Sequence, residues 1–522
     1  MSEYAFNLVD EPCIPVMRHD GTVDRVSIRD AFMNAHELKS VSHPIPIVEF
    51  GLIRLLVAIA MDAIAPKRLS DLIALIKRGG FHDSRINDYL NENHEAFDLF
   101  SASHPFLQDT LASGPSSPVA SLLSSIPTGT NVLHWHRQHD HTFAVSPGEA
   151  AGLLAAIAPF MTEGGRGLSP SINGAPPWYV MPEGRSVFET IVLNLWVSHQ
   201  GNIERGVPAW RRESSLKNKE RRVSASLLES FTWQPRSLRL IPGEGGTCSL
   251  TGEGSAVLVH EMHFTAGEGA GFDWKDPNVA YRVTPKGTFP VRPRQDRSPW
   301  RDIAALALME SDGLVSSAHS VVQMRPGLIS QVSELVRQSD WMAEQPLRIR
   351  LYGMRTNHMK IFEWYRQELR LPMNALWDSP LQSLLIGAVK DTEQAQSELA
   401  KALGSAAARG KHKLSSEARS LILIASGTYW GDMERGFTSF ATNAGKLNQE
   451  TDAPAIDALV EEWRALVRKR VMDAFSGGVD SMRDDSARIL SIERARHRLS
   501  EGLRFLSRPG NVTTEPATGG RT

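Results

Sequence analysis

The chain of 522 residues has little of several features that would assign it to a class at once. It contains only two cysteines, Cys13 and Cys248, which build neither a disulfide framework nor a four-cysteine zinc site and are typical of a reducing compartment. The longest apolar run, Gly51–Met61, is interrupted by Arg54 and is too short to span a bilayer. The N-terminal residues lack a basic region followed by an apolar signal core. We therefore expect a cytoplasmic protein with no membrane partner.

Motifs of the common nucleotide-binding and hydrolytic enzymes are missing as well. The glycine-rich stretch Gly164–Gly167 has no Gly-Lys-Ser/Thr ending and does not connect a strand to a helix, so it predicts neither a P-loop nor a dinucleotide fold. The sequence contains no Gly-x-Ser-x-Gly elbow. We therefore expect no catalytic activity and no cofactor, although glycines beside one arginine would let the backbone approach a phosphate or a groove closely.

The chain also carries little net charge, with a formal value of −2 at pH 7. This excludes a typical free-standing nucleic-acid binder, which is basic overall. The cations are nevertheless concentrated in three clusters, which suit a subunit that touches nucleic acid over part of its surface, although each cluster is equally typical of a solvated face. The clusters are Arg211–Arg222; Arg292, Arg294, Arg297 and Arg301; and Arg348, Arg350, Arg355 and Lys360.

The first 370 residues mix helix and strand signals. Apolar residues at helical spacing predict a helix from Val48 to Ile64 that Pro66 ends. The polar segments Pro127–His141 and Met161–Pro177 have no periodicity and are interpreted as long loops. Short apolar or alternating stretches predict strands at Tyr4–Asp10, Ile14–Val16, Trp178–Met181, Ser237–Ile241, Ala256–Thr265, Tyr281–Thr284 and Arg348–Tyr352.

From about Asp378 the pattern changes to long helices. Four antiparallel helices of about 20 residues predict a four-helix bundle, and the polar tail after Pro509 predicts disorder. The expected fold is therefore α+β, with a mixed α/β domain at 1–370, a bundle at 378–508 and a tail at 509–522. The four helical segments are Pro380–Gly404, Ser415–Thr442, Ala455–Phe475 and Asp485–Leu506.

The segment Leu347–Lys360 is the strongest indication of function. Its first residues alternate between apolar and basic, which predicts a strand. We expect this strand to break at Gly353. Beyond it come cationic, amide and slender apolar side chains, which could meet phosphates, read a groove edge and press between base steps. A solvated turn is the alternative, because many surface hairpins have this composition. The residues after the break are Arg355, Asn357, His358, Met359 and Lys360.

A group of histidines, His134, His136, His139 and His141, is the candidate for catalysis or metal binding, with Asp140 beside them. Their spacing matches neither a His-Glu-x-x-His helix nor a Cys/His finger. A metal-dependent nuclease or hydrolase is therefore the alternative function. A polar loop that contacts a partner or an RNA backbone is the interpretation that we prefer.

Seven short blocks in this order, followed by four helices, resemble the CasA family, the large subunit of the type I-E CRISPR Cascade complex. The resemblance covers essentially the whole chain. The blocks are Phe6–Val16, Ser103–Gln108, Pro127–Asn131, Gly164–Gly167, Phe231–Arg236, Trp274–Pro277 and Leu351–Asn357.

The resemblance implies a non-catalytic subunit of an RNA-guided surveillance complex that acts in antiviral defence. Such a subunit recognises the protospacer-adjacent motif in double-stranded DNA, wedges the strands apart to start the R-loop, and helps to recruit the target-degrading nuclease. Its partners are the 5′ handle of the guide RNA, the target duplex, the other Cascade subunits, and a helicase–nuclease or a sister subunit that carries a nuclease.

The resemblance also implies roles for single residues. The wedge falls on Asn357, His358 and Met359, and many relatives have Gln where His358 stands. The glycine loop near the motif falls on Gly164, Gly165 and Gly167. A lysine of relatives aligns with His263, which carries no fixed charge. The residues implied to contact the guide RNA handle by stacking and hydrogen bonding are Asn131, His134, Trp135 and His136.

Overall fold

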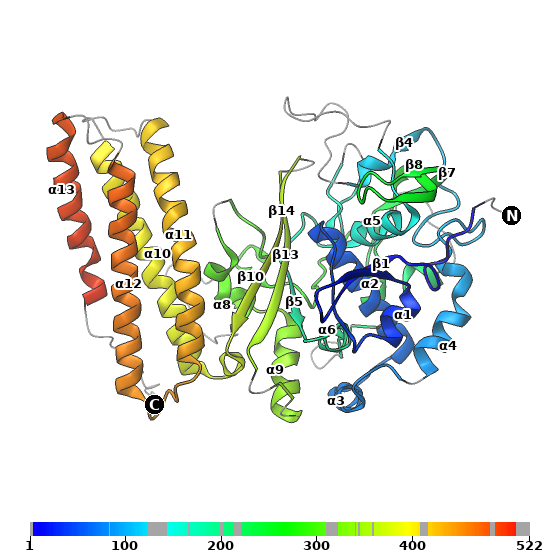
Figure 1. Cartoon of the computed structure of the whole chain (residues 1–522), viewed down its shortest axis with the longest axis horizontal. Helices are drawn as coiled ribbons and strands as arrows, with labels where there is room; N and C mark the ends of the chain where they lie inside the picture. Colours follow the sequence, from blue (N-terminus) through cyan, green and yellow to red (C-terminus); the bar gives the residue numbers. More distant parts are fainter. Residues whose placement is uncertain are drawn as a thin grey trace. The chain divides into compact units, whose positions relative to one another are not determined.

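The computed structural model (Figure 1) describes most of the chain. The described residues form two compact units, one made of Met1–Gln295, Ala305–Ala343 and Leu347–Leu369, the other of Asp296–Ala304, Glu344–Pro346 and Arg370–Thr522. Along the described stretches, no helix is long and apolar enough to cross a membrane. The structure describes residues 4–82, 84–123, 143–164, 167–197, 203–212, 221–295, 297–308, 322–339, 341–342, 345–357, 360–407, 416–480 and 486–507.

The core of the first unit is built on two helices, α2 (Pro46–Ile64) and α5 (Pro147–Phe160). Every residue of α5 is buried, as is every residue of α2 except Ala63. Helices that are apolar on all sides belong in the interior of a domain. Their backbones approach closely at Gly51, where an added Cβ would lie 2.8 Å from the backbone of Ala155. The predicted helix Val48–Ile64 is thus confirmed and begins two residues earlier.

Shorter helices surround this pair. Contacts link α2 to α4, α6 and α7, while α3 and α9 both pack on α6. The remaining helices of the first unit are α1 (Ile28–Met33), α3 (Leu69–Arg78), α4 (Ser84–Glu92), α6 (Val187–Asn194), α7 (Leu227–Phe231) and α9 (Gly327–Ser339), and α8 (Ile303–Leu306) lies where the two units divide.

Small sheets complete the first unit. The sheet orders are β2-β1-β3, β11-β10-β12, β14-β13-β5 and β4-β8-β7, and β6 pairs with β9. The strands are β1 (Ile14–Arg18), β2 (Val23–Val26), β3 (Leu38–Val41), β4 (Ser116–Pro118), β5 (Tyr179–Glu183), β6 (Arg221–Arg222), β7 (Arg236–Thr247), β8 (Gly254–Ala266), β9 (Gly269–Ala270), β10 (Tyr281–Thr284), β11 (Gly287–Pro290), β12 (Val322–Met324), β13 (Leu347–Asn357) and β14 (Lys360–Leu371).

Two strand predictions are corrected. The segment Tyr4–Asp10 is not a strand: Asn7 makes a single bridge to Asp98, and a turn follows. Strand β13 does not break at Gly353 but continues to Asn357. Glycine is needed there for space rather than for a turn, because an added Cβ would lie 2.7 Å from the ring of Trp178.

The second unit contains four long helices, α10 (Ser379–Ala407), α11 (Ser416–Ala444), α12 (Ala453–Asp480) and α13 (Ser486–Gly502). Helix α10 packs against each of the other three, and α11 packs against α12. These helices confirm the expected fold class, a mixed α/β region followed by a helical C-terminal region.

A segment that comes earlier in the chain, Asp296–Ala304, belongs to the second unit. Trp300 stacks on Phe437 with ring centroids 5.0 Å apart, and the Arg301 guanidinium lies 3.6 Å from the ring centroid of Trp430. Arg297 donates to Glu393 at 2.6 Å. Two arginines of the second cationic cluster thus make contacts inside the helical unit.

Candidate nucleic-acid interface

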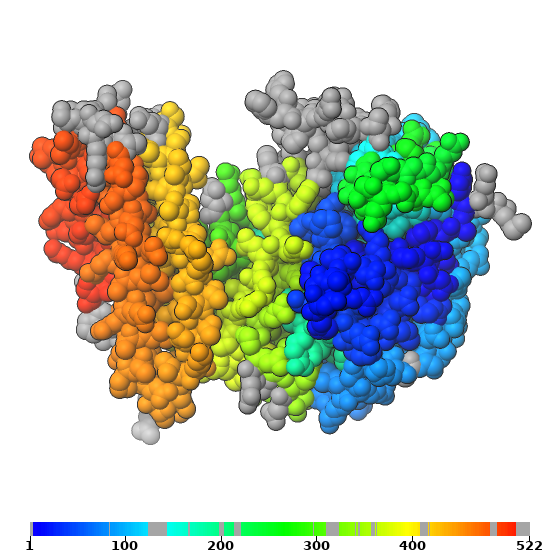
Figure 2. Space-filling model, viewed as in Figure 1, coloured from blue at the N-terminus to red at the C-terminus, as the bar shows by residue number. Residues whose placement is uncertain are grey.

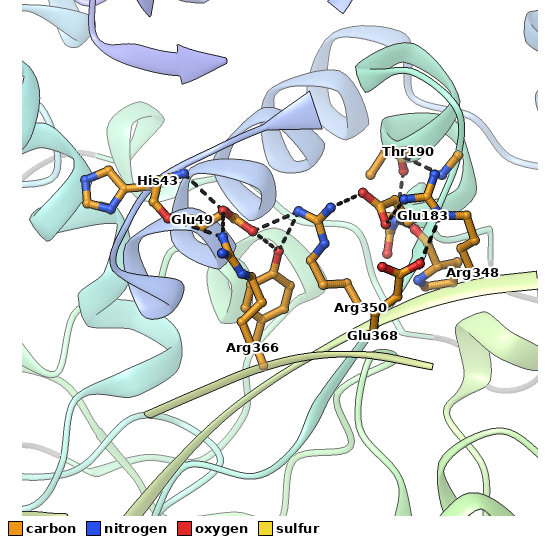
Figure 3. Close-up of polar contacts among 12 residues, drawn as sticks. His43, Glu49, Glu183, Thr190, Arg348, Arg350, Arg366 and Glu368 are labelled. Carbon is orange, nitrogen blue, oxygen red and sulfur yellow. Dashed lines mark hydrogen bonds and ion pairs between the residues drawn. The ribbon is translucent and has the colours of Figure 1, made fainter. Parts of the chain in front are cut away.

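The alternating arginines of β13 point into the first unit (Figure 3), toward carboxylates on α2 and β5. Arg348 donates to Glu183 at 3.1 Å and to Glu368 at 3.3 Å, and Arg350 donates to Glu49 at 2.8 Å and also to Glu183. These two cations were expected to form part of a nucleic-acid surface. The structure corrects this expectation, because their charges are compensated within the protein.

Glu49 is the centre of this network (Figure 3). Its side chain is fully buried on α2 and accepts hydrogen bonds from Arg350 at 2.8 Å, Arg366 at 2.7 Å, the Tyr352 hydroxyl at 2.6 Å and the backbone N–H of His43 at 3.0 Å. A buried carboxylate requires partners of this kind, because isolated burial of its charge is very costly. Both strands of the hairpin are therefore connected to α2 by one residue.

Glu183, on β5, makes a second connection. Burial raises the pKa of its carboxyl group, while the charges of Arg350 and Arg348 act in the opposite direction. A related pair lies nearby, where Glu149 of α5 accepts from His43 Nε2 at 3.0 Å and from Arg25. The base of the β13–β14 hairpin is therefore set in a compensated ionic network. We refer to Glu49, Glu183, Arg348, Arg350, Tyr352 and Arg366 as the hairpin anchor.

Beyond this anchor, β13 continues past β5, the strand that pairs with its first half. Strand β5 pairs only with Arg348–Tyr352, so that the outer part of β13 has β14 as its neighbour in the sheet. Arg355 donates to Glu363 at 3.1 Å and to Gln295 at 3.3 Å, so this predicted site residue is held beside an acid. Asn357 ends β13 and Lys360 begins β14. His358 and Met359, between them, lie outside the described residues.

The glycine segment, residues 162–169, follows the end of α5. Gly164 forms a bridge with Leu168, and Gly167 has a φ of +85°, a conformation that favours glycine. Gly165 lies outside the described residues. The two ends of the predicted segment are therefore described, at Gly164 and at Gly167.

His263 lies on β8, in the surface hairpin that Figure 2 shows in bright green. The register places Arg239 of β7 directly opposite His263, with Ser116 of β4 on the other side. Directly opposed side chains lie about 5 Å apart. Among the described residues, no carboxylate forms an ion pair with Arg239. A fixed positive charge is thus present beside the histidine.

The remaining predicted residues belong to the segment around residues 131–141. Asn131, His134, Trp135 and His136, implied to contact the guide RNA, lie outside the described residues. The same is true of the alternative metal site, which adds His139, Asp140 and His141. Within the described part of the chain, no group of three or more His, Cys, Asp or Glu residues is arranged to hold a metal ion.

Three arginines of the first cationic cluster, Arg211, Arg212 and Arg222, are compensated by acids. Arg211 pairs with Asp62 at 2.8 Å. Arg212 and Arg222 both pair with Glu268, at 2.9 and 3.1 Å, and Arg222 also pairs with Glu229. Such pairs between a partly exposed arginine and a nearly buried acid connect loops of the fold. They leave less free positive charge than the sequence indicates.

Several residues of this site were not predicted from the sequence. Glu49 could have been suspected, because it is an acid within an almost wholly apolar helix. Glu183 gave no signal, since a single acid after a strand is common. Arg239 also gave none, because only the register of β7 and β8 places it beside His263. The described contacts join β13 and β14 to α2 and β5, whereas His263 and Arg239 belong to a separate hairpin.

Comparison with known proteins gives a consistent result. The family model described as CRISPR-associated protein Cse1 matches residues 7–474. A curated relative, the CRISPR-associated protein CasA/Cse1 of Thermus thermophilus, is 27% identical over 496 residues, which cover 90% of this chain and 91% of the relative.

Solved structures share the fold. Cse1 of Thermobifida fusca has a TM-score of 0.77 at 22% identity, covering 96% of this chain and 98% of that one. Cse1 of Acidimicrobium ferrooxidans has a TM-score of 0.76 at 23% identity, covering 97% and 99%. A chain of a CRISPR RNA-guided surveillance complex has a TM-score of 0.72 at 19% identity, covering 95% and 99%. The resemblance inferred from the sequence blocks is confirmed, and the chain belongs to the CRISPR-associated Cse1 family.

Proposed function

We propose that this chain is the large, non-catalytic subunit of an RNA-guided CRISPR surveillance complex. In this role it recognises the protospacer-adjacent motif in duplex DNA, separates the strands to begin the R-loop, and helps to recruit the nuclease that degrades the target. Membership of the Cse1 family supports the proposal, as does the shared fold with a chain of a CRISPR RNA-guided surveillance complex.

The observation that carries the proposal is the anchored β13–β14 hairpin. A wedge must resist the force of duplex closure, because unstacking a base step costs a few kcal/mol. A hairpin whose base is connected to the buried Glu49 and Glu183 meets this requirement. Asn357 ends β13, and His358 and Met359 follow it in the sequence; these three residues would insert beside the base pair.

Other residues would position the duplex. Arg355 and Lys360 would contact phosphates beside the wedge, and the glycine segment would approach the groove. His263 would lie against the groove, with Arg239 supplying the fixed positive charge beside it. Such contacts correspond to about 1–3 kcal/mol of discrimination for each motif base pair.

The partners follow from the same role. Asn131, His134, Trp135 and His136 would stack on the guide RNA handle and form hydrogen bonds with it. The target duplex, the other Cascade subunits, and a helicase–nuclease or nuclease-bearing sister subunit complete the set. Sequence specificity beyond the motif would come from base pairing with the guide rather than from this chain.

A binding experiment tests the proposal directly. The complex is reconstituted with and without this chain and offered target duplexes whose flanking motif is randomised. We expect a narrow set of flanks to be selected only when the chain is present. Equal binding to every flank would refute motif reading and leave a structural adaptor or an enzyme.

A variant tests the wedge separately. Replacing Asn357, His358 and Met359 with glycine should reduce R-loop formation far more than complex assembly. The control places glycine at His19 and Asp20, which are exposed in the turn between β1 and β2 of the same unit. Normal R-loop formation by the triple variant on a correctly flanked target would show that the wedge lies elsewhere.

A further inference from the structure

We propose that Arg236 is the positioning residue of the glycine segment, holding its two ends at the spacing that motif reading requires. This inference rests on the proposed function, because it assumes that the glycine segment contacts the motif. Arg236 itself does not contact the DNA in this proposal. It acts through the backbone of the segment.

The contacts of Arg236 connect both ends of the segment. Its Nη2 donates to the carbonyl oxygen of Thr162 at 2.7 Å, and its Nη1 donates to the carbonyl oxygen of Ser169. Nη1 also donates to the carbonyl of Pro235 at 2.8 Å, which fixes the guanidinium against its own strand. One planar, rigid group therefore connects a residue two positions before Gly164 with a residue two positions after Gly167.

The ends of the segment are also closely packed. The N–H of Gly164 donates to the carbonyl of Leu168 at 3.2 Å. A Cβ added at Gly164 would lie 3.1 Å from Leu168 Cδ1 and 3.5 Å from Arg236 Nη2. The guanidinium thus lies against the first glycine as well as between the two ends. Removing it would leave two carbonyl oxygens without this donor and allow the ends to separate.

The electrostatic setting of Arg236 is unusual for a buried arginine. Arg236 is 4% exposed. Arg54 is equally buried, but it is paired with Asp276. No carboxylate pairs with Arg236 among the residues that the structure describes, and its partners are carbonyl oxygens. Burial lowers the pKa of Arg236 to about 10, so that it stays protonated at neutral pH. Its burial is thus explained by the carbonyls that it holds rather than by an ion pair.

A positioning role differs from a direct phosphate contact in its salt dependence. Each phosphate neutralised by a protein cation contributes about 0.9 to the slope of log K against log salt concentration. Because Arg236 is buried, its loss should leave this slope unchanged while motif preference falls. A binding site whose supporting residues are lost becomes imprecise even when its contact residues remain.

The experiment uses the reconstituted complex with wild-type, Arg236→Met and Arg236→Lys chains, and measures binding to duplexes with the selected flank and with a scrambled flank. We expect the Arg236→Met complex to assemble normally. Its affinity ratio between the selected and the scrambled flank should fall at least tenfold, while the slope of log K against log salt concentration stays unchanged. Arg236→Lys keeps the positive charge but not the planar set of N–H donors, and we expect its flank preference to be reduced as well. Recovery by lysine, or a slope smaller by about 1, would overturn the positioning role.

The control is Arg25→Met. It removes a partly buried guanidinium from Glu149, near the start of α5, whereas the glycine segment follows the end of the same helix. We expect this variant to keep the flank preference. If wild-type complex shows no preference at all, the proposed function fails; if wild type prefers one flank and Arg236→Met prefers it equally, only the present inference fails.

Hydrogen exchange provides a second measurement that does not depend on DNA. In Arg236→Lys, the amides of Gly164 and Ser171, which donate to Leu168 and Met161, should exchange at least tenfold faster than in wild type. Unchanged exchange in a peptide that covers residues 161–171 would show that Arg236 does not hold the segment, and would overturn the inference.

Discussion

Replacing Glu49 with alanine should loosen the base of the β13–β14 hairpin. Removing one partner of a buried ionic group costs about 3–5 kcal/mol, because the remaining charges lose their compensation. Two features place the expected cost near the lower end of this range. The Arg366 side chain is 43% exposed and can be hydrated, and Arg350 keeps Glu183. The buried hydroxyl of Tyr352 loses its acceptor, which alone costs about 1–3 kcal/mol.

Amide hydrogen exchange by mass spectrometry measures this effect where it occurs. Peptides from β13 and β14 report the free energy of local opening, whereas a chain with two compact units need not unfold in one step. A loss of about 3 kcal/mol corresponds to exchange that is about two orders of magnitude faster. The prediction therefore concerns β13 and β14 peptides specifically, not the stability of the whole chain.

The control is Glu363→Ala on the same hairpin. Glu363 pairs with Arg355, but its side chain is 50% exposed, so that its loss should cost less than about 1 kcal/mol. If Glu49→Ala accelerates exchange no more than Glu363→Ala, the buried network does not anchor the hairpin. Helix α2 would then not support the wedge through Glu49.

Three further changes have defined outcomes. Gly353→Ala would bring a methyl group to 2.7 Å from the ring of Trp178, and we expect β13 to be destabilised by about 1–3 kcal/mol in the same exchange measurement. Burial acts to raise the pKa of Glu149, but the hydrogen bonds and charges of His43 and Arg25 outweigh it, so that the pKa lies below its ordinary value. A lowered carboxyl pKa contributes stability that is present above the unfolded value and is lost as the pH falls through the folded value, so Glu149→Gln should flatten the acid limb of a plot of Tm against pH. Arg239→Ala should reduce the salt slope of duplex binding by about 1, and an unchanged slope would exclude a phosphate contact.

Local patterns were sufficient for many elements. The strand Tyr281–Thr284 was predicted with the bounds that the structure shows, and the four C-terminal helices were found within a few residues. The reason is that alternation and helical spacing reflect burial on one side of an element, which neighbouring residues encode. The segment Tyr4–Asp10 shows the limit: Leu8 and Val9 are buried, but in a turn rather than in a strand.

The candidate site depended on contacts between distant parts of the chain. Arg350 and Glu49 are 301 residues apart, and no local pattern predicts that they meet. The same alternation in β13 fits an exposed cationic face and a buried ionic face equally well. Only the position of α2 decides between them, because it places a carboxylate within hydrogen-bonding distance of the guanidinium.

The sequence by itself determined the fold class, several strands and long helices and, through its ordered blocks, the Cse1 family. Those properties follow from burial patterns and turn residues that are local in the chain. The tertiary structure decided which cations are internal, why Gly353 must be glycine, and that Arg236 donates to both ends of the glycine segment. Ion pairs and close approaches are set by distances in space, and these distances exist only after α2, β5, β7 and β13 have packed.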